Sequence, residues 1–135
     1  MPSRVDTILI DCSNPGMLAA FWAAALGYEI RDEWDDGTED QDARIDDPDN
    51  PRMRVLFQKV PDTKTVKNRI HFDLRPSRTR DEEVERLKRL GAIELEGFGG
   101  PEATWKVLQD PEGNEFCVLR GPEDPVPAGA QPVEY

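Results

Sequence analysis

Histidine and cysteine are scarce in this 135-residue chain, which contains one histidine, His71, and two cysteines, Cys12 and Cys117. A site built from several histidines of one chain is therefore excluded. The cysteines form no CxxC pair, and we expect both thiols to be reduced, as is usual inside cells. The sequence also lacks a GxSxG nucleophile motif, a P-loop and a dinucleotide-binding fingerprint.

Long apolar runs and an excess of basic residues are missing too. Lys and Arg number 17 against 28 Asp and Glu, so the net charge is −11. That charge argues against binding to nucleic acid or an anionic membrane surface. It indicates a well-solvated surface, with a cationic substrate or partner as the alternative. No apolar run reaches membrane-spanning length and the start has no signal-peptide core, so we predict a cytoplasmic protein.

The chain contains enough apolar residues, 37%, for one globular domain without disulfides. In the first half, the pattern predicts a strand at 5–11, a helix at 17–26 after the capping sequence Ser13-Asn14-Pro15, and strands at 28–34 and 54–60. The acidic segment 35–50 between the last two strands is expected to be a loop with room for one more strand.

The second half repeats this order. We predict strands at 69–74, 92–96, 104–109 and 115–120, with a helix at 81–90 whose Val84, Leu87 and Leu90 share one side. Loops are expected at 98–101 and at the turn 110–113. A tail with four prolines follows at 122–135 and is expected to be extended or mobile.

The two halves look like copies of one unit. Leu26-Gly27 and Leu90-Gly91, which end the two predicted helices, are 64 residues apart. The turns that begin at Asp47 and Asp110 are 63 residues apart. Agreement of a helix end and a late turn to within one residue favours a duplicated strand-helix-strands unit over chance similarity among α+β proteins.

Several motifs then resemble one family. They are the helix Leu18-Ala19-Ala20-Phe21-Trp22 with Leu26-Gly27, the junction segments 56–61 and 68–74, and the hairpin 110–116. Together they resemble the vicinal-oxygen-chelate superfamily, that is, glyoxalase-like and bleomycin-resistance-like proteins, over about residues 5–120. The resemblance implies an α+β fold in which paired βαβββ modules, about 4–61 and 67–121 within one domain 1–122, form a curved mixed sheet around one cleft. It also implies a homodimer.

Strand alternation selects the side chains that face this expected cleft. On the same reasoning Ile70, Phe72, Phe116 and Val118 should point to the core. The cleft-facing candidates for ligand binding or catalysis are Thr7, Leu9, Asp11, Arg54, Leu56, Gln58, His71, Asp73, Arg75, Glu115, Cys117 and Leu119. Trp105 and Val107 are placed there as well, and Trp105 is the best candidate for a pocket wall, whereas Trp22 should be core and Trp34 could stack on a planar ligand.

The resemblance implies metal ligands at Thr7, at His71, at Cys117 and at either Leu56 or Gln58. Only His71 is a conventional ligand, and Cys117 stands where a carboxylate is usual. We therefore expect a degenerate metal site, with His71 and Cys117 as the ligands if a divalent ion (Zn, Ni, Fe or Mn) binds. Cys117 as small apolar packing is the alternative.

Without a metal, His71 and Asp73 form the catalytic pair that the sequence offers, as a general base and its neighbour about 6–7 Å along the strand. A structural histidine bonded to Asp73, Thr7 or the backbone is the other interpretation. Arg54 and Arg75 could hold a carboxylate or phosphate, although salt bridges with Asp11 and Asp73 explain them more simply.

Three functions follow from these residues. The first is a small-molecule-binding protein or enzyme with a degenerate metal site. The second is a metal-dependent lyase, isomerase or dioxygenase, and the third is a drug-binding protein without catalysis.

Overall fold

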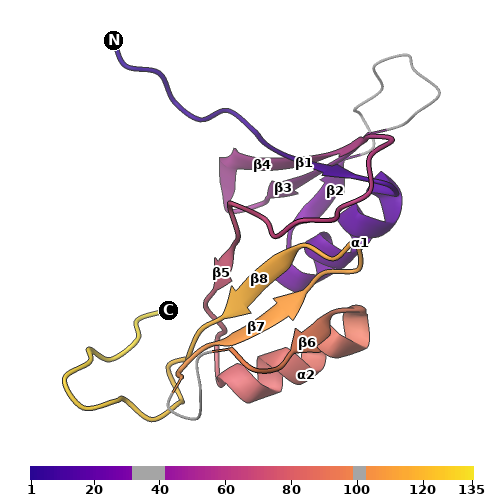
Figure 1. Cartoon of the computed structure of the whole chain (residues 1–135). Coiled ribbons are helices and arrows are strands. Elements are labelled where there is room, and N and C mark those ends of the chain that lie inside the picture. The colour runs from indigo at the N-terminus through magenta and orange to yellow at the C-terminus, as the bar shows by residue number, and fades with distance from the viewer. Residues whose placement is uncertain (32–41, 99–102) are drawn as a thin grey trace. The chain divides into compact units, whose positions relative to one another are not determined.

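The computed structural model describes residues 1–31, 42–98 and 103–135. They form two compact units, Met1–Thr65 and Val66–Tyr135. Each unit contains a helix and a four-stranded mixed sheet, in the order β-α-β-β-β (Figure 1). The predicted α+β fold of two βαβββ modules is confirmed. One domain over 1–122 and one shared cleft stay predictions.

The first unit contains β1 (Ile8–Cys12), α1 (Pro15–Leu26), β2 (Glu29–Arg31), β3 (Ala43–Asp47) and β4 (Asn50–Lys59). Its strand order is β1-β4-β3-β2. The outer strand β1 runs parallel to β4, and the other pairs are antiparallel. The strand allowed for within the acidic segment is therefore β3, which is joined to β4 by the predicted turn.

The second unit contains β5 (Asp73–Leu74), α2 (Arg80–Leu90), β6 (Ile93–Leu95), β7 (Lys106–Gln109) and β8 (Glu115–Val118). Its order, β5-β8-β7-β6, is that of the first unit with corresponding strands substituted. The parallel pair is again the first strand with the last, β5 with β8. The duplication predicted from the offset of 64 residues is confirmed.

Both helices begin and end as the sequence predicts. The Asn14 side chain accepts a hydrogen bond from the Met17 amide at 3.1 Å, and Pro15 occupies the first helical position of α1, where a missing N–H costs nothing. Thr79 caps α2 in the same way. Gly27 and Gly91 end the helices with φ of 70° and 122°, a region that a side chain disfavours.

Each unit has its own apolar core. In the first, Trp22 is buried on α1, as predicted, together with Phe21 and with Phe57 of β4. In the second, Phe116 and Val118 of β8 are buried, also as predicted. Burial of each large apolar side chain contributes about 1.5–3 kcal/mol.

Three sequence predictions about burial are wrong. Ile70, expected in the core, is 82% exposed, because the strand begins only at Asp73 and no ladder orients the preceding residues. Val5 is 76% exposed for the same reason, since β1 begins at Ile8. Leu90 is 38% exposed whereas Val84 and Leu87 are buried, because six residues of helix turn a side chain about 240° away from the first.

The tail is tied to the start of α2. Asp124 Oδ2 accepts hydrogen bonds from the amides of Arg80, at 2.7 Å, and Gly121, at 2.6 Å. The Glu123 amide donates to the Arg78 carbonyl at 3.1 Å. The beginning of the predicted extended tail is therefore bonded to the fold. No helix in the described ranges is long and apolar enough to cross a membrane.

Two predictions fall on residues outside the described ranges. They are Trp34, the candidate for stacking on a ligand, and the glycine-proline part of the loop at 98–101.

Candidate functional site

A pocket of about 600 Å³ lies in the second unit. It is lined by five residues that the sequence selects as site candidates: His71, Asp73, Trp105, Glu115 and Cys117. The remaining lining residues are Lys67, Leu95, Phe98, Val107 and Leu119. Val107 and Leu119 were also placed on the cleft side by strand alternation.

The register of the sheet explains why the polar residues meet. In β8, alternation buries Phe116 and Val118 and turns Cys117 to the opposite face. Because β5 pairs with β8 in parallel, Asp73 lies directly beside Cys117. The Cys117 amide also donates to the Phe72 carbonyl at 2.9 Å, which holds the segment that carries His71 against β8.

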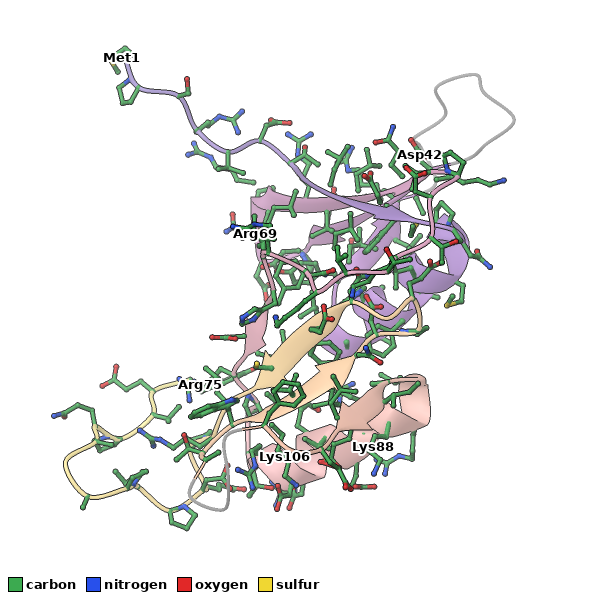
Figure 2. The ribbon with its side chains drawn as sticks, viewed as in Figure 1. Met1, Asp42, Arg69, Arg75, Lys88 and Lys106 are labelled. Carbon is green, nitrogen blue, oxygen red and sulfur yellow. The ribbon has the colours of Figure 1, made fainter. Side chains whose placement is uncertain are left out.

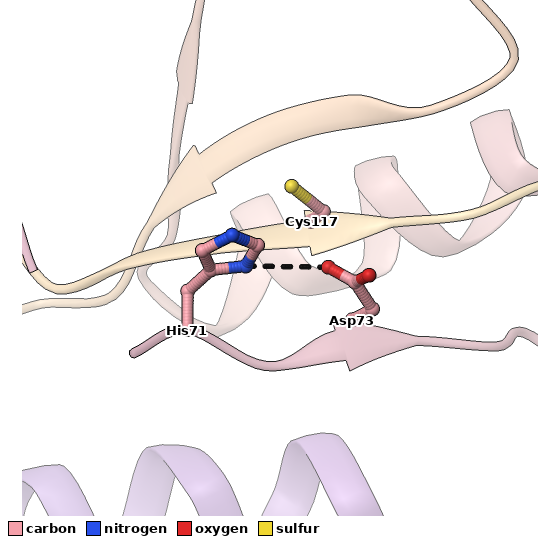
Figure 3. Close-up of side chains that lie close together, drawn as sticks. All are labelled: His71, Asp73 and Cys117. Atoms are coloured by element: carbon pink, nitrogen blue, oxygen red, sulfur yellow. Dashed lines mark ion pairs between the residues drawn. The ribbon is translucent and has the colours of Figure 1, made fainter. Parts of the chain in front are cut away.

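His71, Asp73 and Cys117 form a compact group on the pocket wall (Figure 3). His71 Nδ1 lies 3.2 Å from Asp73 Oδ1. One donor atom from each of the three residues lies within 4.8 Å of the other two. The His71 and Asp73 side chains are 39% and 52% exposed, so the pair is open to a ligand that enters the pocket.

The Cys117 thiol is unsuited to act as a free nucleophile. Burial raises its pKa, and the neighbouring Asp73 carboxylate raises it further by repelling a thiolate. The Lys67 ammonium opposes this shift, as the last of the causes. At neutral pH the thiol therefore keeps its proton unless a cation takes the proton's place.

The remaining pocket wall is apolar and partly aromatic. Trp105 is 41% exposed and Phe98 is 53% exposed, so both offer ring surface to a ligand. Phe98, Leu95 and Lys67 were missed at the sequence level. Phe98 lies in a loop and Lys67 before the first strand of the module, where no periodicity indicates the direction of a side chain.

The first-unit candidates lie on the parallel pair β1 and β4. In its register Asp11 is opposite Gln58, and both are exposed. Leu56, by contrast, is buried at 7% exposure, although alternation placed it on the cleft side. The Thr7 hydroxyl donates to Asp6 at 2.9 Å. A cleft that these residues share with the second-unit pocket stays a prediction.

The two arginine candidates have other partners than the sequence suggested. Arg54 pairs with Asp6 at 3.6 Å rather than with Asp11. Arg75 donates to the Arg120 carbonyl at 2.6 Å rather than to Asp73 (Figure 2). The register explains the second difference, because Arg75 continues β5 alongside the end of β8, where the backbone carbonyls are nearer than its own neighbour's carboxylate.

The group also fits a metal ion, with a donor set that differs from the one implied by the resemblance. It combines an imidazole nitrogen, a carboxylate oxygen and a thiol sulfur, all accepted ligands of zinc. Asp73 takes part in place of a first-unit residue. Three protein ligands with a position left for water or substrate are typical of catalytic zinc sites.

Comparison with known families identifies the class. A family model of the glyoxalase-like domain matches residues 7–119, which include both βαβββ modules. The chain belongs to this glyoxalase-like domain family. No curated protein sequence matches it.

Solved structures of the superfamily have the same fold. UcmS2 has 22% sequence identity and a TM-score of 0.63, with 88% of this chain and 98% of that chain covered. A glyoxalase/bleomycin resistance protein/dioxygenase family enzyme from Burkholderia phytofirmans PsJN has 16% identity and a TM-score of 0.62, with 84% and 94% covered. At such identities the likeness establishes the α+β fold of curved mixed sheets alone.

A third similar structure contains a metal. It is a mutant of the fosfomycin resistance protein FosX from Listeria monocytogenes, complexed with Mn(II) and 1S,2S-dihydroxypropylphosphonic acid. Its identity to this chain is 18% and its TM-score 0.65, with 90% of this chain and 94% of that chain covered.

Proposed function

We propose that this protein binds a small organic molecule in the second-unit pocket and acts on its polar end through His71 and Asp73. The observation that carries the proposal is the division of the pocket wall. Trp105 and Phe98 offer aromatic surface, while the polar group occupies the sheet side. Such a pocket, mostly apolar with a few convergent polar groups, is the usual form of a small-molecule site.

The chemistry open to this pair is proton transfer. When His71 Nδ1 carries the hydrogen that faces Asp73, its Nε2 is the basic atom. Nε2 then accepts a proton from an acidified C–H or O–H of the ligand, and Asp73 stabilises the imidazolium that forms. Return of that proton to another atom gives an isomerase, and loss of a leaving group from the ligand gives a lyase.

Metal-assisted catalysis is the second candidate, and the grouping of three donors favours it. A bound divalent ion would polarise a ligand oxygen as a Lewis acid. His71, Asp73 and Cys117 would hold the ion, and the apolar wall would orient the rest of the ligand and exclude water.

Binding without turnover is the third form of the proposal, and one experiment separates it from the others. Anilinonaphthalene sulfonate, an aromatic anion, serves as the probe, and its fluorescence reports entry into the pocket. Trp105→Ala should weaken probe binding at least about tenfold, since loss of one stacked aromatic removes about 1–3 kcal/mol. Ile93→Ala is the matched control, because Ile93 is exposed and does not line the pocket.

Compounds that displace the probe are then tested for conversion by wild type and by His71→Ala. Turnover that disappears in His71→Ala while binding persists supports the catalytic forms. Binding without turnover supports sequestration. Equal probe affinity in Trp105→Ala and wild type would refute the location of the site.

The assembly and compartment implied at the sequence level stay predictions. We propose a homodimer, which light scattering would report as twice the chain mass of 15.3 kDa.

A further inference from the structure

We propose that His71, Asp73 and Cys117 form a thiolate-containing zinc site that lies wholly within the second module. The inference rests on the metal-assisted form of the proposed function and names its ion and ligands. It departs from the set implied by the family resemblance in two respects. Asp73 replaces the ligands expected from the first module, and a sulfur ligand stands where a carboxylate is usual.

The spacing of the three donors is the first argument. In a tetrahedral zinc site with Zn–N and Zn–O of about 2.0–2.1 Å and Zn–S of about 2.3 Å, neighbouring ligand atoms are about 3.4–3.6 Å apart. His71 Nδ1 and Asp73 Oδ1 are already 3.2 Å apart. The whole group lies within 4.8 Å, so rotation of exposed side chains closes the remaining gap without movement of the backbone.

The backbone geometry is the second argument. Asp73 and Cys117 are register partners of a parallel pair, so the sheet itself fixes the spacing between two of the three ligands. Sites on strands hold their geometry better than sites on loops. His71 is two residues before Asp73, on the same side of the chain, and the hydrogen bond from the Cys117 amide to Phe72 secures the segment between them.

The charge balance is the third argument. Asp73 and a deprotonated Cys117 together bring two negative charges to one side of the pocket, and Lys67 is the only cationic side chain among the lining residues. A divalent ion neutralises these two charges. On binding, the S–H bond of Cys117 breaks, its proton goes to solvent, and a sulfur–zinc bond forms.

The sulfur decides which ions the site prefers. Thiolate and imidazole ligands suit zinc and cobalt, whereas manganese and magnesium prefer oxygen ligands. Almost any nitrogen, oxygen and sulfur site binds zinc more tightly than manganese, so that order by itself tests nothing. The informative quantity is the part of the zinc preference that depends on Cys117.

The experiment uses the full chain after removal of any histidine tag, because His71 is otherwise the only histidine. Zinc and manganese binding are measured by calorimetry, and cobalt binding by the thiolate-to-cobalt charge-transfer absorption in the near ultraviolet. The variants are Cys117→Ser, Cys117→Glu and His71→Ala, each checked for folding by circular dichroism. Cys12→Ser is the matched control, since Cys12 is a buried thiol of the first unit.

Wild type and Cys12→Ser should bind one zinc ion and show the charge-transfer band. Cys117→Ser should lose the band and weaken zinc binding at least about tenfold, as even outer-shell changes at zinc sites cost 10–100-fold. His71→Ala should weaken zinc binding by a similar factor. Cys117→Glu should bind metal without the band and with a smaller ratio of zinc to manganese affinity.

A second readout needs no substitution. Zinc should protect Cys117 of the wild type from alkylation by iodoacetamide, as mass spectrometry would detect, while buried Cys12 stays unmodified with or without zinc. The proposal is overturned by absence of saturable zinc binding, by a charge-transfer band that survives in Cys117→Ser, or by equal alkylation of Cys117 with and without zinc. Probe binding measured in the presence of a chelator is separate, so failure of the zinc site and failure of the pocket are distinguishable.

Discussion

The contact between Gly121 and the chain before α2 leads to the sharpest stability prediction. Gly121 follows β8, and a Cβ placed on it would lie 2.0 Å from the Arg78 carbonyl oxygen and 2.7 Å from the Arg78 carbonyl carbon. An ordinary carbon–oxygen contact is about 3.3 Å or longer, so Gly121→Ala requires a backbone movement of more than about 1 Å. The neighbouring backbone belongs to the connection between β5, which carries Asp73, and α2.

The cost follows from the hydrogen bonds at this contact. Arg78 accepts from the Glu123 amide, and Asp124 accepts from the amides of Gly121 and Arg80. A bond to a charged group contributes about 1.5–3 kcal/mol and a neutral one about 0.5–1.5 kcal/mol. Loss of one bond of each kind would lower the free energy of unfolding by about 2–4 kcal/mol.

Urea unfolding followed by far-ultraviolet circular dichroism measures this change, with slopes of about 1–3 kcal/mol/M for small proteins. Gly16→Ala is the matched control. Gly16 lies in the first turn of α1, and the nearest atom to an added Cβ is 3.9 Å away. It should be stabilising by up to about 1 kcal/mol, because alanine is the better helix former. A Gly121→Ala protein within about 0.5 kcal/mol of wild type would refute the reasoning.

Three further substitutions test hydrogen bonds by the same unfolding assay. Asp46 is buried and its pKa is lowered, chiefly by the hydrogen bond from Arg44, so its stabilisation is present at neutral pH and lost as the pH falls below about 3.8. Asp46→Asn should therefore cost about 1–3 kcal/mol at pH 7, and a gap to wild type that does not narrow in acid would contradict the assignment. Asp110→Asn should cost about 1–3 kcal/mol, because it turns an amide NH₂ toward the Asn114 side chain, which now donates to the buried carboxylate at 2.9 Å. Asn14→Ala should cost about 1 kcal/mol through loss of the α1 cap, and an unchanged midpoint would contradict that role.

The local elements could be predicted from the sequence because their causes are local. The Asn14-Pro15 start and Gly27 end of α1 depend on capping and on positive φ, which a few adjacent residues decide. The equal spacing of Gly27 and Gly91 indicated the duplication before any contact was known. Alternation along β8 likewise identified Cys117 as a pocket-facing residue between buried Phe116 and Val118.

Alternation failed where no ladder was formed or where both faces of a strand are covered. Ile70 alternates correctly with Phe72 but precedes β5, so nothing turns its side chain inward. Leu56 lies in β4, where three consecutive residues are buried. The salt-bridge partners of Arg54 and Arg75 were mistaken for a related reason, since long side chains reach whichever acceptor the neighbouring strand presents.

The sequence by itself determined the order of elements, the duplication and the family resemblance, because these depend on periodicity and on motifs of a few adjacent residues. It also limited the chemistry, since one histidine and two cysteines allow few sites. Only the tertiary structure decided that Asp73 and Cys117, 44 residues apart in the chain, are register partners, with His71 in contact with Asp73. Strand pairing depends on hydrogen bonds between distant segments, which no local pattern specifies. For that reason the group of three donors emerged from the fold.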